Sequence, residues 1–494
     1  MQRTAAKQPP KRRRPSSAAT PKAPPAATPS PTPATRATPS PSRPVPLLAS
    51  PLANLSQRTR EALAVSVIVL FGVAVVAIWW QDTPAGSVRD LGTRLIAAGQ
   101  ITGLAGTYLV VIEVLLMGHV PSLDRFIGTD RLAVWHRRNG EYVVVLLVGH
   151  AVLTVWGYAI TGRTALVPET KTVVLSYPDM LAATVGLALF IVVAVTSARA
   201  ARRHMRYQTW YFVHLYAYLA IALSFAHQLA TGGDFVQHPL NRALWVAMFA
   251  VAGALLVWCR LVAPARDAIR HRLVVADVVP EAGGALSVYV TGQRLWELEA
   301  EPGQYFLWRF LTRDKWWQAH PFSLSAAPNG RWLRLTAKGS GDFTASLAQL
   351  EPGVRVVAEG PFGAFTRHRR RRRKVLLVGG GIGIAPLRAL FEGLAAGPGD
   401  LTLLYRASSD DDVVFRHELE DLADKRGATI HYLVGSRAQT PDLLDSRHLR
   451  SLVADVAHHD VFVCGPPGMT ARVVSSLRDA RVPRRHIHTE GFEY

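Results

Sequence analysis

Four histidines lie in or beside apolar stretches of the chain, at spacings that suit the binding of metal. His136 and His150 are 14 residues apart, and His214 and His227 are 13 residues apart. On helices, which rise 1.5 Å per residue, these steps cover about 21 and 20 Å. If the two helices run in the same direction, His136 opposes His214 and His150 opposes His227. Each pair could give two neutral imidazoles to one haem iron, which leaves no open coordination position and favours electron transfer.

The two spacings differ in how well they keep both ligands on one helix face. A 14-residue step ends about 40° short of four turns, whereas a 13-residue step ends about 140° short. We therefore expect the helix that carries His214 and His227 either to be distorted or to present its two rings differently. The alternative is that these histidines form hydrogen bonds between helices or at the membrane interface. We favour haem because two pairs fall at matched depth.

A second group of residues is of a type that binds phosphates. HPFSLSAAP (320–328) is followed by KGSGDFTASL (338–347), in which Gly341 and Thr344 stand at the start of a predicted helix. The free N–H groups and the dipole of a helix N-terminus bind phosphate. Taken alone, this segment could equally be an ordinary capped helix.

A third segment, KVLLVGGGIGIAPLRAL (374–390), reads as a strand, a glycine turn and a helix. Gly381, Gly383 and Pro386 form GxGxxP, a variant of the dinucleotide-binding fingerprint in which proline suits the first helical turn. The next strand ends at Arg406, which with Arg437 could hold a 2′-phosphate. This pair favours NADPH over NADH.

The end of the chain supplies further candidates. DVFVCGPPGM (460–469) places Cys464 and Gly465 at the carboxyl edge of a parallel sheet, where open α/β folds bind ligands. Cys464 is therefore a candidate site residue. The chain closes with EGFEY, so Phe492 or Tyr494 could cover a flavin face and help to position hydride transfer.

Six apolar stretches can each cross about 30 Å of hydrocarbon as a helix. They are residues 62–80, 95–117, 142–160, 177–196, 211–229 and 243–259. Basic residues are concentrated in alternate loops and in the N-terminal segment, so the positive-inside rule predicts that both termini are cytoplasmic. Glu113 lies in the second stretch, where we favour snorkelling or an arginine partner over a role in proton relay.

Composition agrees with a membrane part joined to a soluble part. Hydrophobic residues make up 49% of the 494 residues and charged residues 19%, and the mean hydropathy is +0.14. The formal charge of +20 comes mainly from two runs: residues 1–60, with eleven Lys/Arg and no acid, and residues 367–374. The two cysteines, Cys259 and Cys464, exclude a disulfide framework, a four-cysteine zinc site and a cysteine-ligated iron–sulfur cluster.

The predicted fold is multidomain: an α-helical transmembrane bundle of six spans, then an antiparallel β-barrel, then an α/β parallel sheet. We expect a disordered basic Pro/Ala-rich tail at 1–60, the six-span domain at 61–265, the barrel at 268–370 and the α/β domain at 371–494. The tail could lie on an anionic leaflet, but we favour a solvated segment. For the run at 367–374 we likewise favour a solvated loop over binding to phosphates, lipid or nucleic acid.

HPFSLS, GGGIGIAP, CGPPGM and the aromatic terminus together resemble the FAD/NAD(P) module of the ferredoxin–NADP reductase type. Joined to six spans with paired histidines, the chain resembles the ferric reductase/NADPH oxidase superfamily over residues 60–494. The resemblance implies FAD, NADPH or NADH, and two b-type haems as cofactors. The residues that it implies as haem ligands are His136, His150, His214 and His227. Those implied for the flavin and nucleotide are His320, Pro321, Phe322, Ser323, Lys338, Gly339, Gly341, Thr344, Gly380, Gly381, Gly383, Gly465 and Pro466.

The hypothesis is therefore a multi-pass cell-membrane flavocytochrome that passes electrons from cytoplasmic NAD(P)H to an acceptor outside. A ferric chelate is the favoured acceptor, and oxygen, giving superoxide, is the alternative. We expect contact with membrane lipid and none with nucleic acid, and the oligomeric state is left open. The remote alternatives are a membrane scaffold without enzymatic activity or a protein that tethers nucleic acid.

Overall fold

The computed structural model describes residues 57–84, 86–205, 207–339, 342–435 and 443–491. The predicted tail at 1–60 lies mostly outside these ranges, although its last residues, from Gln57, begin the first helix. Arg437, Gly341, Phe492 and Tyr494 also lie outside the described residues.

Six helices in the described residues are long and apolar enough to cross a membrane, which confirms the predicted number of spans. They are α1 (Gln57–Asp82), α2 (Leu91–Leu116), α4 (Thr129–Thr161), α6 (Met180–Ser197), α8 (Tyr207–Thr231) and α10 (Pro239–Val257). The last one continues through a π-helical turn, Trp258–Val262, into α11 (Ala263–His271). Large apolar side chains such as Leu70 and Val145 are exposed on these helices, as expected where lipid is the solvent.

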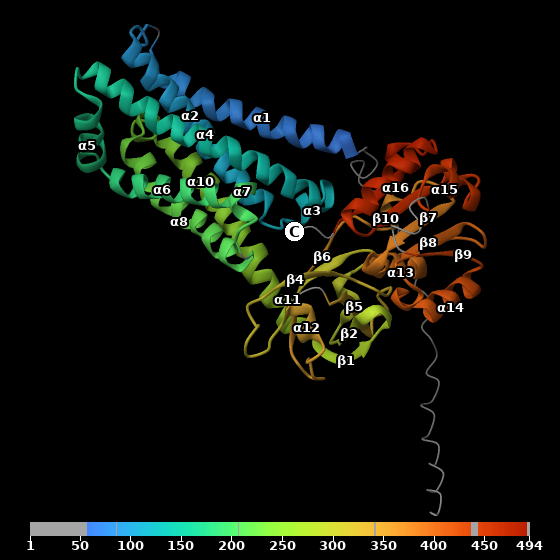
Figure 1. Ribbon diagram of the computed structural model, residues 1–494. Helices are drawn as coiled ribbons and strands as arrows, with labels where there is room; N and C mark the ends of the chain where they lie inside the picture. Colours follow the sequence, from blue (N-terminus) through green and yellow to red (C-terminus); the bar gives the residue numbers. More distant parts are fainter. Residues whose placement is uncertain (1–56, 85, 206, 340–341, 436–442, 492–494) are drawn as a thin grey trace, which may run out of the picture. The chain divides into compact units, whose positions relative to one another are not determined.

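Short helices connect the spans. They are α3 (Pro121–Phe126), α5 (Leu166–Ser176), α7 (Arg199–Arg202) and α9 (Gly233–Val236). The helix α5 lies between the predicted apolar stretches 142–160 and 177–196, and the sequence analysis predicts no helix there. Within the bundle, α2 packs along α4, and α6 packs along α8 (Figure 1). These two pairings matter because they surround the predicted histidine ligands.

The barrel consists of two three-stranded antiparallel sheets, with strand orders β1-β2-β5 and β4-β3-β6. Its strands are β1 (Val274–Pro280), β2 (Ala285–Thr291), β3 (Tyr305–Phe310), β4 (His320–Ser323), β5 (Trp332–Lys338) and β6 (Val356–Phe362). Bridges Val274↔Arg355 and Leu324↔Leu335 join the sheets. Alternate residues point inward, so that Phe306, Trp308 and Leu335 form a core. After β5 comes the short helix α12 (Asp342–Leu347).

The last part is a five-stranded parallel sheet in the order β11-β10-β7-β8-β9. Its strands are β7 (Val375–Gly380), β8 (Leu401–Ala407), β9 (Thr429–Val434), β10 (Asp460–Cys464) and β11 (Ile487–Glu490). β7, β8 and β10 are the strands that the sequence placed before the glycine turn, before Arg406 and before Gly465.

Helices cover both faces of this sheet. They are α13 (Ile384–Gly393), α14 (Arg416–Arg426), α15 (Ser446–Leu452) and α16 (Pro467–Asp479). Leu377 and Leu403 pack with residues of α13 and α14, whereas Leu376 and Leu404 pack with residues of α15 and α16. The continuous apolar strands of the sequence therefore belong to a sheet that is buried on both faces.

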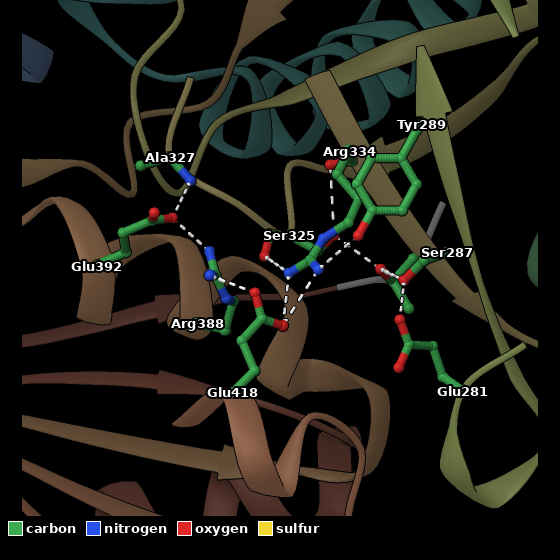
Figure 2. A network of polar contacts seen from close by, with 10 residues as sticks. Glu281, Ser287, Tyr289, Ser325, Ala327, Arg334, Arg388, Glu392 and Glu418 are labelled. Atoms are coloured by element: carbon green, nitrogen blue, oxygen red, sulfur yellow. Dashed lines mark hydrogen bonds and ion pairs between the residues drawn. The ribbon is translucent and has the colours of Figure 1, made fainter. Parts of the chain in front are cut away.

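A network of buried charges joins the barrel to the parallel-sheet part (Figure 2). Arg334 of β5 is only 3% exposed and donates to Glu418 of α14 from both terminal nitrogens, each at 3.1 Å. Glu418 also binds Arg388 of α13, which in turn binds Glu392 on the same helix. Glu392 accepts a hydrogen bond of 2.7 Å from the backbone N–H of Ala327. This bond connects the network to the barrel a second time.

Hydrogen bonds fix the basic run at 367–374 to the protein at several points. Arg370 donates to the carbonyl of Ala395, and Arg372 donates to the carbonyl of Ala457 at 2.5 Å. The backbone N–H groups of Arg371 and Arg372 both donate at 2.5 Å to Asp460, which is fully buried at the start of β10. The run is therefore partly solvated, as predicted, with Arg367, His368, Arg371 and Arg373 exposed, and it is also fixed to the protein by these bonds.

Candidate functional site

The structure brings the four predicted histidines together in the expected pairs. The ring centroids of His136 and His214 are 5.9 Å apart, and those of His150 and His227 are 6.4 Å apart. His136 and His150 come from α4, while His214 and His227 come from α8. Two metal–nitrogen bonds of about 2 Å, added to two ring radii of about 1.1 Å, put the centroids of opposed imidazoles about 6 Å apart. Both separations thus fit an iron held between two rings.

Three of the histidines contact the protein through Nδ1, which leaves Nε2 as the possible ligand atom. Nδ1 of His150 lies 2.8 Å from the carbonyl oxygen of Gly99, and Nδ1 of His214 lies 3.2 Å from Oγ of Ser197. Nδ1 of His136 lies 2.9 Å from a carboxylate oxygen of Glu113. Metal-bound histidines commonly donate their second N–H to such an acceptor, which fixes the tautomer and the ring orientation.

The fourth histidine and one glycine give further support to the fit. Within the described residues, Nδ1 of His227 is buried and meets no hydrogen-bond partner. A Cβ at Gly103 would lie 2.6 Å from Nδ1 of His150. The glycine therefore leaves the space that the His150 ring occupies. The residues present therefore fit haem.

The 13-residue step in α8 is accommodated without a break in the helix. α8 is α-helical from Tyr207 to Thr231, so the expected distortion is not found there. The rings instead approach differently: the planes of His136 and His214 are inclined at 69°, and those of His150 and His227 at 34°. We expected either a distorted helix or two rings presented at different angles, and the structure shows the second.

Glu113 is held by polar side chains of α4 and not by an arginine. Its Oε1 lies 2.9 Å from Nδ1 of His136, and its Oε2 accepts a hydrogen bond of 2.6 Å from Asn139. Among the described residues, the predicted arginine partner is therefore not found. The sequence could not show this, because Glu113 and His136 lie on different helices.

The residues predicted to line the flavin lie on β4. His320 stacks on Phe343 with ring centroids 3.6 Å apart, and Phe322 stacks on the same ring at 6.2 Å. Burial, with a smaller effect of Lys315, lowers the pKa of His320 to about 4, so the ring is neutral near pH 7. A neutral ring offers a flavin an apolar face and a hydrogen-bonding nitrogen, but no charge for its phosphates.

The other predicted flavin residues differ in their surroundings. Pro321 pairs with Leu307 of β3, and Ser323, which is buried, pairs with Tyr305. Lys338 at the end of β5 forms an ion pair of 2.7 Å with Asp412, and the hydrogen bond from Lys338 holds the pKa of Asp412 below its usual range. Lys338 is therefore already engaged by a residue after β8. Beside it, Gly339 faces open space, while Thr344 lies in α12.

The glycines of the predicted nucleotide turn are packed against the end of β10. A Cβ at Gly383 would lie 2.4 Å from the carbonyl oxygen of Cys464, and one at Gly380 would lie 2.2 Å from the sulfur of Met469. Gly381 has φ of +53°, and its carbonyl accepts a hydrogen bond from the Tyr405 hydroxyl at 3.2 Å. Only a glycine at Gly380 and at Gly383 allows this turn to lie so close to the end of β10. The binding of a phosphate at the start of α13 remains a prediction.

Cys464 and its neighbours complete the carboxyl edge of the sheet. Cys464 pairs with Gly379 in β7 and with Glu490 in β11. Burial, with a smaller effect of Glu490, raises the pKa of the Cys464 thiol well above its usual range. The thiol is therefore neutral near pH 7. Pro466 follows as the N-cap residue of α16.

Arg406 lies near the end of β8, as predicted, but its guanidinium forms hydrogen bonds to backbone carbonyls. Its Nη1 donates to the carbonyls of Leu433 at 2.7 Å and Ala407 at 2.9 Å. Burial lowers the pKa of its guanidinium. Its role toward a 2′-phosphate remains a prediction, as does that of Arg437.

Sequence reasoning missed several residues of these sites. Met469 and Tyr405 support the glycine turn, Glu490 lies beside Cys464, and Asn139 holds Glu113. Met469 and Glu490 could have been suspected, because they lie inside the quoted segments CGPPGM and EGFEY. The other two depend on contacts between elements that are distant in sequence.

Three families of proteins match successive parts of the chain. Residues 102–225 match the ferric reductase like transmembrane component, residues 275–366 the FAD-binding domain, and residues 377–475 the oxidoreductase NAD-binding domain. The first match covers the helices that carry the four histidines, and the other two cover the barrel and the parallel sheet.

Individual relatives cover the chain only in part. Ferredoxin–NADP reductase B of Sorangium cellulosum is 33% identical over 35% of this chain and 77% of its own length. The ferredoxin reductase component of 3-ketosteroid-9-alpha-monooxygenase from Mycolicibacterium smegmatis is 32% identical over 45% of this chain, which spans 65% of that relative.

Among solved structures, the flavohem-like FAD/NAD binding domain of nitric oxide dioxygenase from Vibrio cholerae is 23% identical. The similarity covers 44% of this chain and 98% of that one, with a TM-score of 0.38.

The three domain matches occur in one chain with six candidate membrane spans. The chain is therefore a multi-pass membrane oxidoreductase that uses FAD and NAD(P)H, and it belongs to the ferric reductase/NADPH oxidase superfamily.

Proposed function

We propose that this protein carries electrons across the cell membrane, from cytoplasmic NADPH to an acceptor outside, through FAD and two haems. The observation that carries the proposal is the pair of facing histidine sets on α4 and α8, with ring centroids 5.9 and 6.4 Å apart. At about 1.5 Å per residue, the two sets are separated by about 20 Å of helix. One histidine pair, with its haem, would thus lie in each half of the bilayer.

The chain's residues would position the cofactors and tune them. Gly380, Gly381 and Gly383 would hold the dinucleotide phosphates, and Cys464 would border the nicotinamide with a neutral thiol. His320 would border the flavin with a neutral ring. When bound, FAD would divide the electron pair of a hydride and haem would carry single electrons.

A ferric chelate is the proposed acceptor, supported by the match of residues 102–225 to the ferric reductase like component. Oxygen is the alternative, because electron transfer from an exposed haem edge requires no dedicated substrate pocket. We propose NADPH as the donor from the position of Arg406 and Arg437, and NADH is the competing donor. Membrane lipid is the proposed surrounding partner, and no nucleic acid is involved.

The decisive experiment is anaerobic. NADPH is added to the purified full-length protein, and the absorbance of flavin and haem is recorded; the reduced protein is then mixed separately with oxygen and with a ferric chelate. We expect both cofactors to be reduced and the ferric chelate to reoxidise the haem faster. Faster reoxidation by oxygen would identify an oxidase. A preparation that contains flavin but no haem would contradict the proposed relay.

A further inference from the structure

The two histidine pairs differ in one respect, which is the group behind His136. We propose that Glu113 lowers the reduction potential of the haem held by His136 and His214 relative to that of the haem held by His150 and His227. The inference deepens the proposed function and rests on it, since it requires that both haems are present.

Both oxygens of the Glu113 carboxylate are fixed by α4. Oε1 lies 2.9 Å from Nδ1 of His136, and Oε2 accepts from Nδ2 of Asn139 at 2.6 Å. Asn139 also donates to the carbonyl of Leu109, one turn before Glu113 on α2, at 2.9 Å. The Glu113 side chain is 19% exposed, so it is largely shielded from water. The carboxylate is therefore held in contact with the imidazole, whose Nδ1 also hydrogen-bonds to the backbone carbonyl of Glu113 at 3.3 Å.

The helix that carries His136 also makes room for this carboxylate. His136, Asn139 and Gly140 lie three and four residues apart, so they share one face of α4. A Cβ at Gly140 would lie 2.9 Å from Oε1 of Glu113. The small residue is thus part of the arrangement, because a larger side chain at this position would press on the carboxylate.

The other three histidines have neutral surroundings or no partner at Nδ1. His150 faces the Gly99 carbonyl and His214 faces the Ser197 hydroxyl, while His227 meets no partner among the described residues. A cation, Arg202, lies on the His214 side, 4.3 Å above the ring of Trp210. Because Arg202 is exposed, water and salt screen its charge, whereas the contact of Glu113 is direct.

A carboxylate behind a metal-bound imidazole makes that imidazole a stronger donor. A stronger donor stabilises the oxidised, more positive iron, so the reduction potential falls. With a lower potential at the pair His136/His214, an electron placed there would move spontaneously toward His150/His227. Glu113 would act as a positioning residue that gives the relay a direction.

The test is a redox titration of the full-length protein in detergent, followed by the haem absorbance. Glu113→Gln removes the charge and keeps the size of the side chain. We expect the lower of the two haem potentials to rise enough to change the electron distribution between the haems at least tenfold, which corresponds to 59 mV for a one-electron couple. The matched control is Glu141→Gln, which removes an exposed carboxylate two residues after Asn139 and should shift neither potential.

A second variant guards against poor folding of Glu113→Gln. Gly140→Ala keeps the charge but presses on the carboxylate, so it should shift the same potential upward by a smaller amount. Unchanged potentials in both variants, or an equal shift in Glu141→Gln, would overturn the inference. If the wild-type protein shows no haem spectrum, the proposed function itself fails. If it shows both haems and Glu113→Gln has no effect, only the role of Glu113 fails.

Discussion

His320 shows how burial sets the charge of a single side chain next to the proposed flavin. Its ring is packed against Phe343, and its pKa falls to about 4. In the unfolded chain the pKa is near 6.5. Between these two values the unfolded state binds a proton that the folded state does not bind. The linkage relation then requires that stability falls as the pH drops from about 6.5 toward 4.

We therefore expect His320→Gln to weaken the pH dependence of stability over this window. The melting temperature of the wild-type barrel should fall between pH 6.5 and pH 4, and that of the variant should fall less. Because half-buried groups are partly solvated, the difference should be a few degrees at most. Parallel curves for the two proteins would show that His320 takes up its proton equally in both states.

At the scale of residues, the sequence could identify those side chains whose role follows from a local motif. Gly381 and Gly383 are examples, because a strand, a turn and a helix are contiguous in the chain. The pairing of His136 with His214 could also be predicted, since it follows from direction and spacing alone. The partner of Glu113 could not be predicted, because it depends on how α2 and α4 are rotated about their axes.

At the scale of elements, the glycine turn joins β7 to β10. Gly383→Ala would place a methyl group 2.4 Å from the Cys464 carbonyl, which is backbone and cannot move cheaply. Gly380→Ala would instead meet the flexible end of Met469. We expect Gly383→Ala to cost about 1–3 kcal/mol and to raise the KM for NADPH, whereas Gly380→Ala should cost less. Thermal unfolding and initial rates with a soluble acceptor measure both effects, and the reverse order would contradict this packing argument.

The charge network between β5, α13 and α14 is a second element-scale feature. Glu418→Ala would leave the buried guanidinium of Arg334 with fewer acceptors. We expect a loss of about 2 kcal/mol, because a buried charge without its partner is costly. Asp421→Ala, at an exposed position of the same helix, should change stability by less than about 0.5 kcal/mol. Similar melting temperatures for the two variants would show that Arg334 finds another partner.

The sequence predicted the type of most elements, because long apolar runs and strands buried on both faces leave clear patterns. Local sequence gives little sign of β6 and β11. β6 contains Gly360 and Pro361, which weaken a strand pattern, and β11 is only four residues long. Both are fixed by their pairing with β3 and β10, which local sequence does not show.

At the scale of the whole molecule, electron delivery should require both histidine pairs, while flavin reduction should require neither. His150→Ala should therefore leave anaerobic reduction of the flavin by NADPH intact and should abolish reduction of an external ferric chelate. The measurement uses vesicles with NADPH on the cytoplasmic side and the chelate on the other. External reduction at the normal rate in this variant would show that electrons take another route.

The hydrogen bonds of the basic run should affect how fast proteases cleave the protein there. Five consecutive arginines at 369–373 offer an arginine-specific protease repeated cleavage points. The backbone N–H groups of Arg371 and Arg372 are held by Asp460, and Arg370 and Arg372 are tied to carbonyls, so the segment cannot readily take the extended form that a protease requires. Cleavage there should be slow in the native protein and rapid once the sheet opens. The rate of cutting at this run would then report how often β10 separates from the segment that precedes β7.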